Sequence, residues 1–120
     1  MHDLAALLAE VSRHFDRVPA NVHVSWASNA QLLKETGSAF EIWALAWNHA
    51  DGLFIGINEQ LRAAPKYVLK YLVFHELLHF VLRPRGRCHH HRAFRVAERV
   101  WPDYVRANAW LDANESRVLR

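Results

Sequence analysis

Cysteine is nearly absent from this chain, which has only Cys88 among its 120 residues. A single cysteine cannot form an internal disulfide, so the sequence excludes a small disulfide-stabilised extracellular fold and suits a reducing compartment. Long apolar runs are also missing, because charged or strongly polar residues interrupt every stretch before the ~18 residues that a membrane span needs. The N-terminal stretch lacks a basic start and a small-residue cleavage site, so we do not expect a secretion signal. The sequence predicts a cytoplasmic protein with no membrane contact.

Internal repeats, low-complexity tracts and glycine- or serine-rich linkers are absent as well, and no shift in composition marks a second domain. We therefore expect one domain over residues 1–120. With 52% hydrophobic and 22% charged residues, the composition is that of an ordinary globular protein and excludes a disordered chain. The net charge of +3 permits contact with nucleic acid without requiring it. The sequence gives no indication of the oligomeric state.

Histidine is what the chain has in abundance. Nine histidines are present, and five of them fall within seventeen consecutive positions: His75, His79, His89, His90 and His91. The neutral imidazole ring is a common metal ligand in proteins. A metal site is therefore the first functional hypothesis.

The hydrophobic pattern of the first half predicts a helix followed by three strands. Apolar residues share one helical stripe over residues 3–18, and residues 21–27 alternate as in a strand. Residues 40–47 and 53–57 flank a turn signal and predict a hairpin with a longer loop. We expect a small, mainly antiparallel three-stranded sheet, with residues 53–57 at its edge.

The second half predicts three helices. Residues 66–82 are apolar on nearly every side, which indicates a buried helix. A loop rich in arginine follows, and then two shorter helices over about residues 90–101 and 103–114. Helix, strands and then helices in this order are typical of an α+β fold.

The predicted buried helix contains His75-Glu76-Leu77-Leu78-His79, which matches the motif H-E-x-x-H. Four residues advance a helix by ~400°, so His75 and His79 share one face and can direct two ring nitrogens at one ion. Catalytic zinc usually has three protein ligands and a water, and Glu76 beside the first ligand would act as the general base on that water. Chance matches to the motif are common, but an apolar helix is a costly place for three unpaired polar groups.

A third ligand should follow the arginine-rich loop. The cluster of His89, His90 and His91 begins ten residues after His79, and spacing alone does not choose among the three. Cys88 is another candidate, although a small half-buried thiol is its more usual role. Glu98 is a further candidate from the next helix.

The motif and the residues after it resemble a known family. The shared features are HELLH, His90-x-x-x-Phe94, Trp101-Pro102-Asp103-Tyr104 and Trp110-Leu111, preceded by Ile55-Gly56-Ile57-Asn58-x-x-Leu61. Over residues 53–111 they resemble the SprT-like, YgjP-like and minigluzincin group of small zinc metallopeptidases. The resemblance implies a minimal zincin-like fold, one zinc ion held by His75, His79 and His90, Glu76 as base, and a peptide or protein substrate. The distance from Phe94 to Pro102 is one residue shorter than we expect for the YgjP-like branch. His89 and His91 therefore remain alternatives to His90 as the third ligand.

Other assignments are weaker. Tyr104 is a candidate for stabilising an oxyanion, but packing of the last helix is its more usual role. The arginines between 83 and 99 suggest a basic rim and a nucleic-acid-associated SprT-like protease, yet a solvated face is the simpler reading. A zinc-stabilised binding module without activity is the main alternative function, and residues 112–120 lying across the cleft would make a latent enzyme. A metal-dependent nucleic-acid enzyme is disfavoured, because such sites often use three histidines without the Glu76 equivalent.

Overall fold

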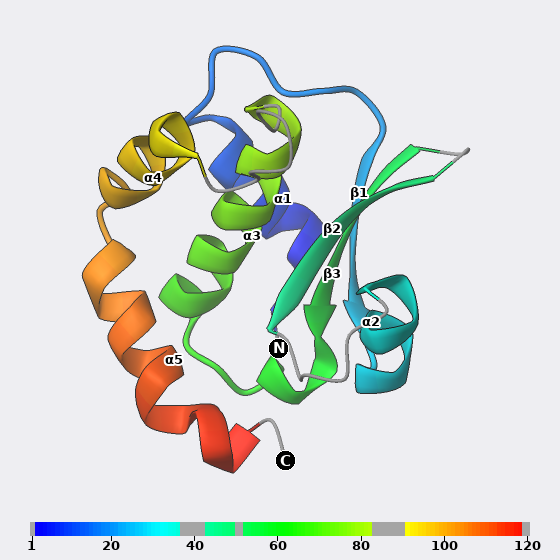
Figure 1. Cartoon of the computed structure of the whole chain (residues 1–120), viewed down its shortest axis with the longest axis vertical. Helices are drawn as coiled ribbons and strands as arrows, with labels where there is room; N and C mark the ends of the chain where they lie inside the picture. Colours follow the sequence, from blue (N-terminus) through cyan, green and yellow to red (C-terminus); the bar gives the residue numbers. More distant parts are fainter. Residues whose placement is uncertain (1, 37–42, 50–51, 83–90, 119–120) are drawn as a thin grey trace.

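Helix α3, Lys66–Val81, lies at the centre of the molecule, with a sheet on one side and two further helices on the other (Figure 1). The computed structural model describes residues 2–36, 43–49, 52–82 and 91–118. The remaining elements, in chain order, are α1 (Leu4–Ser12), β1 (Val22–Ala27), α2 (Asn29–Thr36), β2 (Ala44–His49), β3 (Gly52–Asn58), a 3-10 helix (Glu59–Leu61), α4 (Arg92–Arg99) and α5 (Tyr104–Val118). The predicted α+β class is confirmed.

The three strands form a mixed sheet in the order β1-β3-β2. Strands β2 and β3 are the predicted hairpin and pair antiparallel, whereas β1 and β3 pair in parallel. The sheet is therefore mixed rather than mainly antiparallel as predicted, because the hairpin brings β3 back alongside β1 in the parallel direction. The prediction that residues 53–57 form an edge strand was wrong, since β3 lies between its two neighbours. Of the two edge strands, β2 contacts α3.

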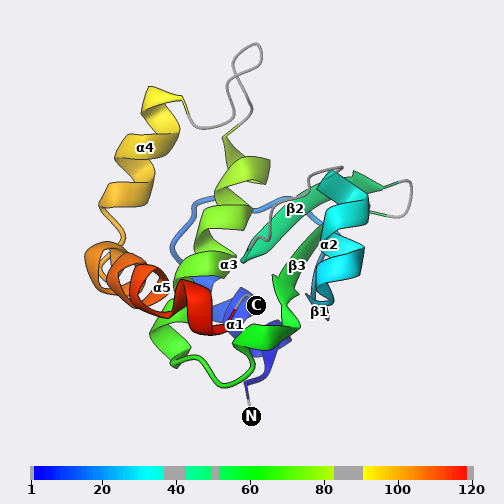
Figure 2. The same cartoon turned by 60° about the horizontal axis from the view of Figure 1, so that its bottom comes forward.

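The alternation along each strand decides which side chains meet α3. Ile55 and Ile57 of β3 are fully buried in the same core as α3, and the Cα pairing places Ala46 and Ala44 of β2 beside them on that face. Trp47 and Phe54 point to the other face, where their rings stack with centroids 5.8 Å apart. Helix α2 contacts β2 and β3 and lies on the side of the sheet away from α3 (Figure 2).

Helix α3 is buried on nearly all sides, as its composition predicts. Its core residues are Val68, Leu69, Tyr71, Leu72, Val73, Phe74, Leu77 and Leu78. Helix α1 packs along it, with Leu7 and Val11 in the same core, and α4 and α5 contact it from the side away from the sheet (Figure 1). A helix with this many buried contacts is a rigid support for polar groups. No helix in the described part of the chain is long and apolar enough to cross a membrane.

Helix α1 is shorter than its apolar stripe suggests. Asp3 caps its N-terminus by accepting a hydrogen bond from the backbone N–H of Ala6 at 3.2 Å, and the helix ends at Ser12. Phe15 and Val18 follow the helix in non-helical backbone but still pack against the core. Their burial therefore does not depend on the helix continuing to residue 18.

Candidate metal centre

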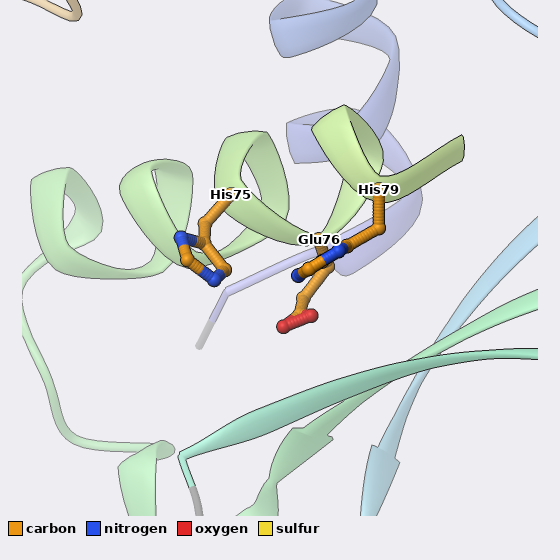
Figure 3. Close-up of side chains that lie close together, drawn as sticks. All are labelled: His75, Glu76 and His79. Carbon is orange, nitrogen blue, oxygen red and sulfur yellow. The ribbon is translucent and has the colours of Figure 1, made fainter. Parts of the chain in front are cut away.

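Two histidines and one glutamate of α3 converge on one point. His75 and His79 lie four residues apart, and their rings meet edge to face with centroids 5.2 Å apart. One ligand atom of each of His75, Glu76 and His79 lies within 4.8 Å of the others. The three side chains leave α3 on the side that faces strand β2 (Figure 3). Imidazole nitrogens and a carboxylate oxygen this close together are a donor set that suits zinc and other divalent metals.

Glu76 is the buried acid of this group. Only 6% of its surface is exposed, and among the described residues Asn58 is the other buried polar residue. Burial raises the pKa of Glu76 to about 7, with a contribution from the negative charge of Glu98, while the positive charge of His75 opposes the shift. A carboxyl group with a pKa near neutrality can both accept and release a proton.

Glu98 reaches the same centre from α4. Its carboxylate contacts Nδ1 of His75, and both side chains are mostly buried. Burial disfavours the charged ring, but the hydrogen bond to Glu98 and the charges of Glu76 and Glu98 outweigh it and raise the pKa of His75. A carboxylate bound to one ring nitrogen of a histidine orients the ring, so that the other nitrogen, here Nε2, can be directed at a metal.

Phe94 connects the two histidines to the start of α4. This fully buried ring lies 5.1 Å from the ring of His75 and 4.7 Å from that of His79, centroid to centroid. His91 is the N-cap of α4, and its Nδ1 accepts a hydrogen bond from the backbone N–H of Phe94 at 3.3 Å. The three-residue metal group found among the described residues includes neither His91 nor Glu98. The candidates His90, His89 and Cys88 lie outside the described residues.

A cavity of about 330 Å³ opens beside the metal group, between α3, α5 and the start of β2. Its lining residues are Trp43, Ala44, Tyr71, Leu72, His75, Glu76, Asn108 and Leu111. The sequence did not single out Tyr71 as a functional residue, because it is one of many apolar positions of α3. Its position one helical turn before His75 was the available signal, since i and i+4 share a helix face.

Tyr104 lies near His75. It lines a second cavity of about 190 Å³ together with Glu98, and its ring meets that of Tyr71 edge to face. Tyr104 is therefore close to the metal group but does not line the cavity that contains Glu76. The arginines of α4, namely Arg92, Arg95 and Arg99, are exposed.

Sequence comparisons agree with this geometry. The sequence model of the YgjP-like metallopeptidase domain matches residues 38–114, which is more than half of the chain. No curated protein and no solved structure matches the chain. The matched range includes β2, β3 and all of the helices that position His75, Glu76, His79 and Glu98. The chain belongs to the family of YgjP-like metallopeptidase domains.

Proposed function

We propose that the protein is a zinc-dependent peptidase in which Glu76 is the general base and His75, His79 and His90 hold one zinc ion. The observation that carries this proposal is the convergence of His75, Glu76 and His79 on one face of a buried helix, in a chain of metallopeptidase ancestry. We place the activity in the cytoplasm, because a lone cysteine suits a reducing compartment.

The contacts around Phe94 support His90 as the third ligand. Phe94 touches the rings of both His75 and His79, and the backbone N–H of Phe94 is bound by His91 at the start of α4. His90 directly precedes this cap in the sequence, and the family resemblance assigns it as the third ligand. Three histidines and an open position form the usual arrangement of a hydrolytic zinc site.

The residues of the chain have distinct tasks in this reaction. When bound, zinc supplies the Lewis acidity that lowers the pKa of a coordinated water toward ~7 and polarises a peptide carbonyl. Glu76 accepts a proton from the attacking water at a carboxylate oxygen and later donates it to the nitrogen of the leaving amine. Glu98 holds Nδ1 of His75, and the apolar side chains around Glu76 limit the access of other water molecules.

Strand β2 is the element suited to bind an extended peptide. It is an edge strand, it contacts α3, and the metal group faces it (Figure 3). An edge strand offers unpaired backbone N–H and C=O groups that an extended peptide can pair with. We therefore propose that an extended peptide pairs with β2, because residues 53–57, which the sequence placed at the edge of the sheet, lie in its middle strand.

The experiment that tests the function is a digest of a peptide library by zinc-loaded protein, read by mass spectrometry. We expect the parent to cleave peptides and Glu76→Gln to lose activity by at least about 100-fold while retaining zinc, since general-base catalysis contributes roughly 10²–10⁴-fold. Glu115→Gln, at an exposed position of α5, is the matched control and should behave as the parent.

Equal cleavage by the parent and Glu76→Gln would contradict the mechanism. Zinc binding without cleavage would instead favour a zinc-stabilised binding module or a latent enzyme. Removing residues 112–120, which follow the cavity residue Leu111 in α5, separates these two. Cleavage would appear only in the latent enzyme.

A further inference from the structure

We infer that the cavity between α3, α4 and the start of α5 binds a carboxylate group of the substrate, through Arg95 and Arg99, close to the cleaved bond. The inference rests on the proposed peptidase function and adds a class of substrate: peptides cleaved near a free C-terminus or near an acidic side chain. The cavity measures about 190 Å³ and is lined by His75, Phe94, Arg95, Glu98, Arg99 and Tyr104.

Two arginines on one face of α4 supply the donors for such a group. Arg95 and Arg99 lie four residues apart and both line the cavity, so their side chains are neighbours on the helix surface. Both are exposed, and neither forms an ion pair with a carboxylate in the part of the chain that the structure describes. A guanidinium group offers a planar fork of N–H donors that matches the two oxygens of a carboxylate. The hydroxyl of Tyr104 can donate a further hydrogen bond.

The charges that line the cavity favour an occupant with one negative charge. Arg95 and Arg99 contribute two positive charges, and Glu98 contributes one negative charge. The Glu98 carboxylate is mostly buried and already contacts Nδ1 of His75. A single carboxylate therefore balances the remaining positive charge, whereas a lysine or arginine side chain of the substrate would be repelled by both guanidinium groups.

The volume of the cavity indicates one functional group rather than a whole ligand. Pockets that enclose whole small molecules usually measure about 300–1,000 Å³, and this cavity is smaller, at about 190 Å³. Among the described residues that line it, Phe94 alone lacks a polar side-chain group, so little apolar surface is available to cover a long apolar side chain. A carboxylate with its connecting atoms suits both the size and the lining.

The cavity also lies within reach of the bond that Glu76 and the metal would act on. His75, a proposed zinc ligand, lines this cavity as well as the larger one that contains Glu76. Tyr71 of the larger cavity and Tyr104 of this one have ring centroids 5.9 Å apart. An extended peptide advances by about 3.3–3.6 Å per residue, so the bound carboxylate belongs to a residue a few positions from the cleaved bond at most. Its source is the C-terminus of a short fragment or the side chain of an aspartate or glutamate.

The test compares peptides that differ only in this carboxylate. Zinc-loaded protein is given peptides from the library digest in two kinds of pair: a free against an amidated C-terminus, and glutamate against glutamine near the bond in amidated peptides. We expect kcat/KM to be higher by about 10-fold or more for the carboxylate member of at least one kind of pair. A preference in the first kind identifies an enzyme that cleaves near the C-terminus, and one in the second kind an enzyme selective for acidic residues. Both results support the inference.

Variants of the two arginines connect this preference to the cavity. Arg95→Gln and Arg99→Gln, each made alone, should reduce the preference at least about 3-fold, because each removes a charge-assisted hydrogen-bond donor. Both positions are exposed, so the exchanges should leave the fold intact. Arg92→Gln is the matched control, since it is the same exchange at an exposed position of α4 that does not line the cavity. It should retain the parent's preference.

Equal kcat/KM within both kinds of pair would overturn the inference and leave the peptidase function intact. A preference that survives unchanged in both Arg95→Gln and Arg99→Gln would overturn it as well. If no peptide is cleaved at all, the proposed function fails, and the cavity is then tested by NMR. N-acetylglycine should shift the Arg95 and Arg99 Nε signals of the zinc-loaded protein but not that of Arg92, and N-acetylglycinamide should shift none of them. Unshifted Arg95 and Arg99 signals in N-acetylglycine would overturn the inference.

Discussion

The carboxylate of Glu98 contacts the His75 ring, which we propose as a metal ligand. Its contact with Nδ1 fixes which ring nitrogen carries the proton and which one faces the metal group. We expect Glu98→Ala to weaken zinc binding by about 10–100-fold, the range typical of lost partners behind a metal ligand. Glu98→Gln should be milder, because an amide oxygen still accepts a hydrogen bond from Nδ1–H.

Zinc affinity is measured by competition with a chromogenic chelator, with Glu115→Gln as the exposed control. Unchanged affinity in Glu98→Ala would show that the His75–Glu98 contact does not orient the ligand. A loss of zinc affinity beyond about 1,000-fold in Glu98→Ala would indicate that Glu98 is itself a metal ligand. NMR of the His75 ring nitrogens tests this independently, because the His75 tautomer would then be the same in Glu98→Ala and in the parent.

The buried carboxyl group of Glu76 makes the stability of the metal-free protein depend on pH. Burial raises its pKa from 4.5 to about 7 in the folded state, so the protonated form is favoured there. This contribution is fully present below pH 4.5 and is lost as pH rises through 7. We expect metal-free Glu76→Gln to be more stable than the parent at pH 8.5, by up to about 3 kcal/mol, and we expect this difference to fall below about 1 kcal/mol at pH 5.

Urea denaturation in the presence of a chelator measures the free energy of unfolding of the parent and of Glu76→Gln at each pH. A stability difference between Glu76→Gln and the parent that is the same at pH 5 and pH 8.5 would show that Glu76 is already ionised in the folded protein at the lower pH.

Among the elements, those with a strong hydrophobic period were predictable and those without one were not. The all-round apolar pattern of α3 predicted residues 66–82, and the helix spans Lys66–Val81. Helix α2 was missed, because NAQLLKET is mostly polar and its buried residue Leu32 packs outside the main core. The order of the strands was also missed, since a period of two shows which face is buried but not which strand lies in the middle.

Because β3 lies between two strands, the chain has little space for a side chain at Gly56. A Cβ atom at this position would lie 3.0 Å from Cζ3 of Trp47 and 3.2 Å from Cβ of Ala27, closer than ordinary contact. We expect Gly56→Ala to lower the free energy of unfolding by about 1–3 kcal/mol, the usual cost of overpacking. Trp47→Leu removes one of the two contacts, so the double variant should lose less than the sum of the single variants. Urea denaturation of the two single variants and the double variant measures these free energies. If the two single losses simply add, the Gly56→Ala strain does not come from the contact with Trp47.

For the whole molecule, the sequence predicted the convergence of His75, Glu76 and His79 better than the cavity beside them. His75, Glu76 and His79 form a local motif, so helical geometry alone brings them together. The contact of Glu98 with His75, by contrast, spans 23 positions and depends on how α4 packs on α3. Trp43, Tyr71 and Asn108 meet at one cavity from three separate elements or their flanks, and no spacing in the sequence connects them.

If His75, His79 and His90 hold one metal ion as proposed, binding of that ion should stabilise the entire fold. A zinc ion that binds the folded chain and not the unfolded one would add ~2.7 kcal/mol at about 100 times its dissociation constant. For a domain of this size, that corresponds to an increase in Tm of roughly 10 °C. We expect this shift in the parent by differential scanning calorimetry, its reversal by a chelator, and its loss in His79→Ala.

His23→Ala is the matched control, since His23 is exposed on β1 and stacks on Phe54 at the face of the sheet away from α3. It should retain the zinc-dependent shift even if its own Tm is lower. A shift that survives in His79→Ala would mean that zinc stabilises the protein from another site. His90→Ala tests the proposed third ligand in the same way, because a zinc ion held by only His75 and His79 should bind more weakly, so more zinc should be needed to reach the same Tm.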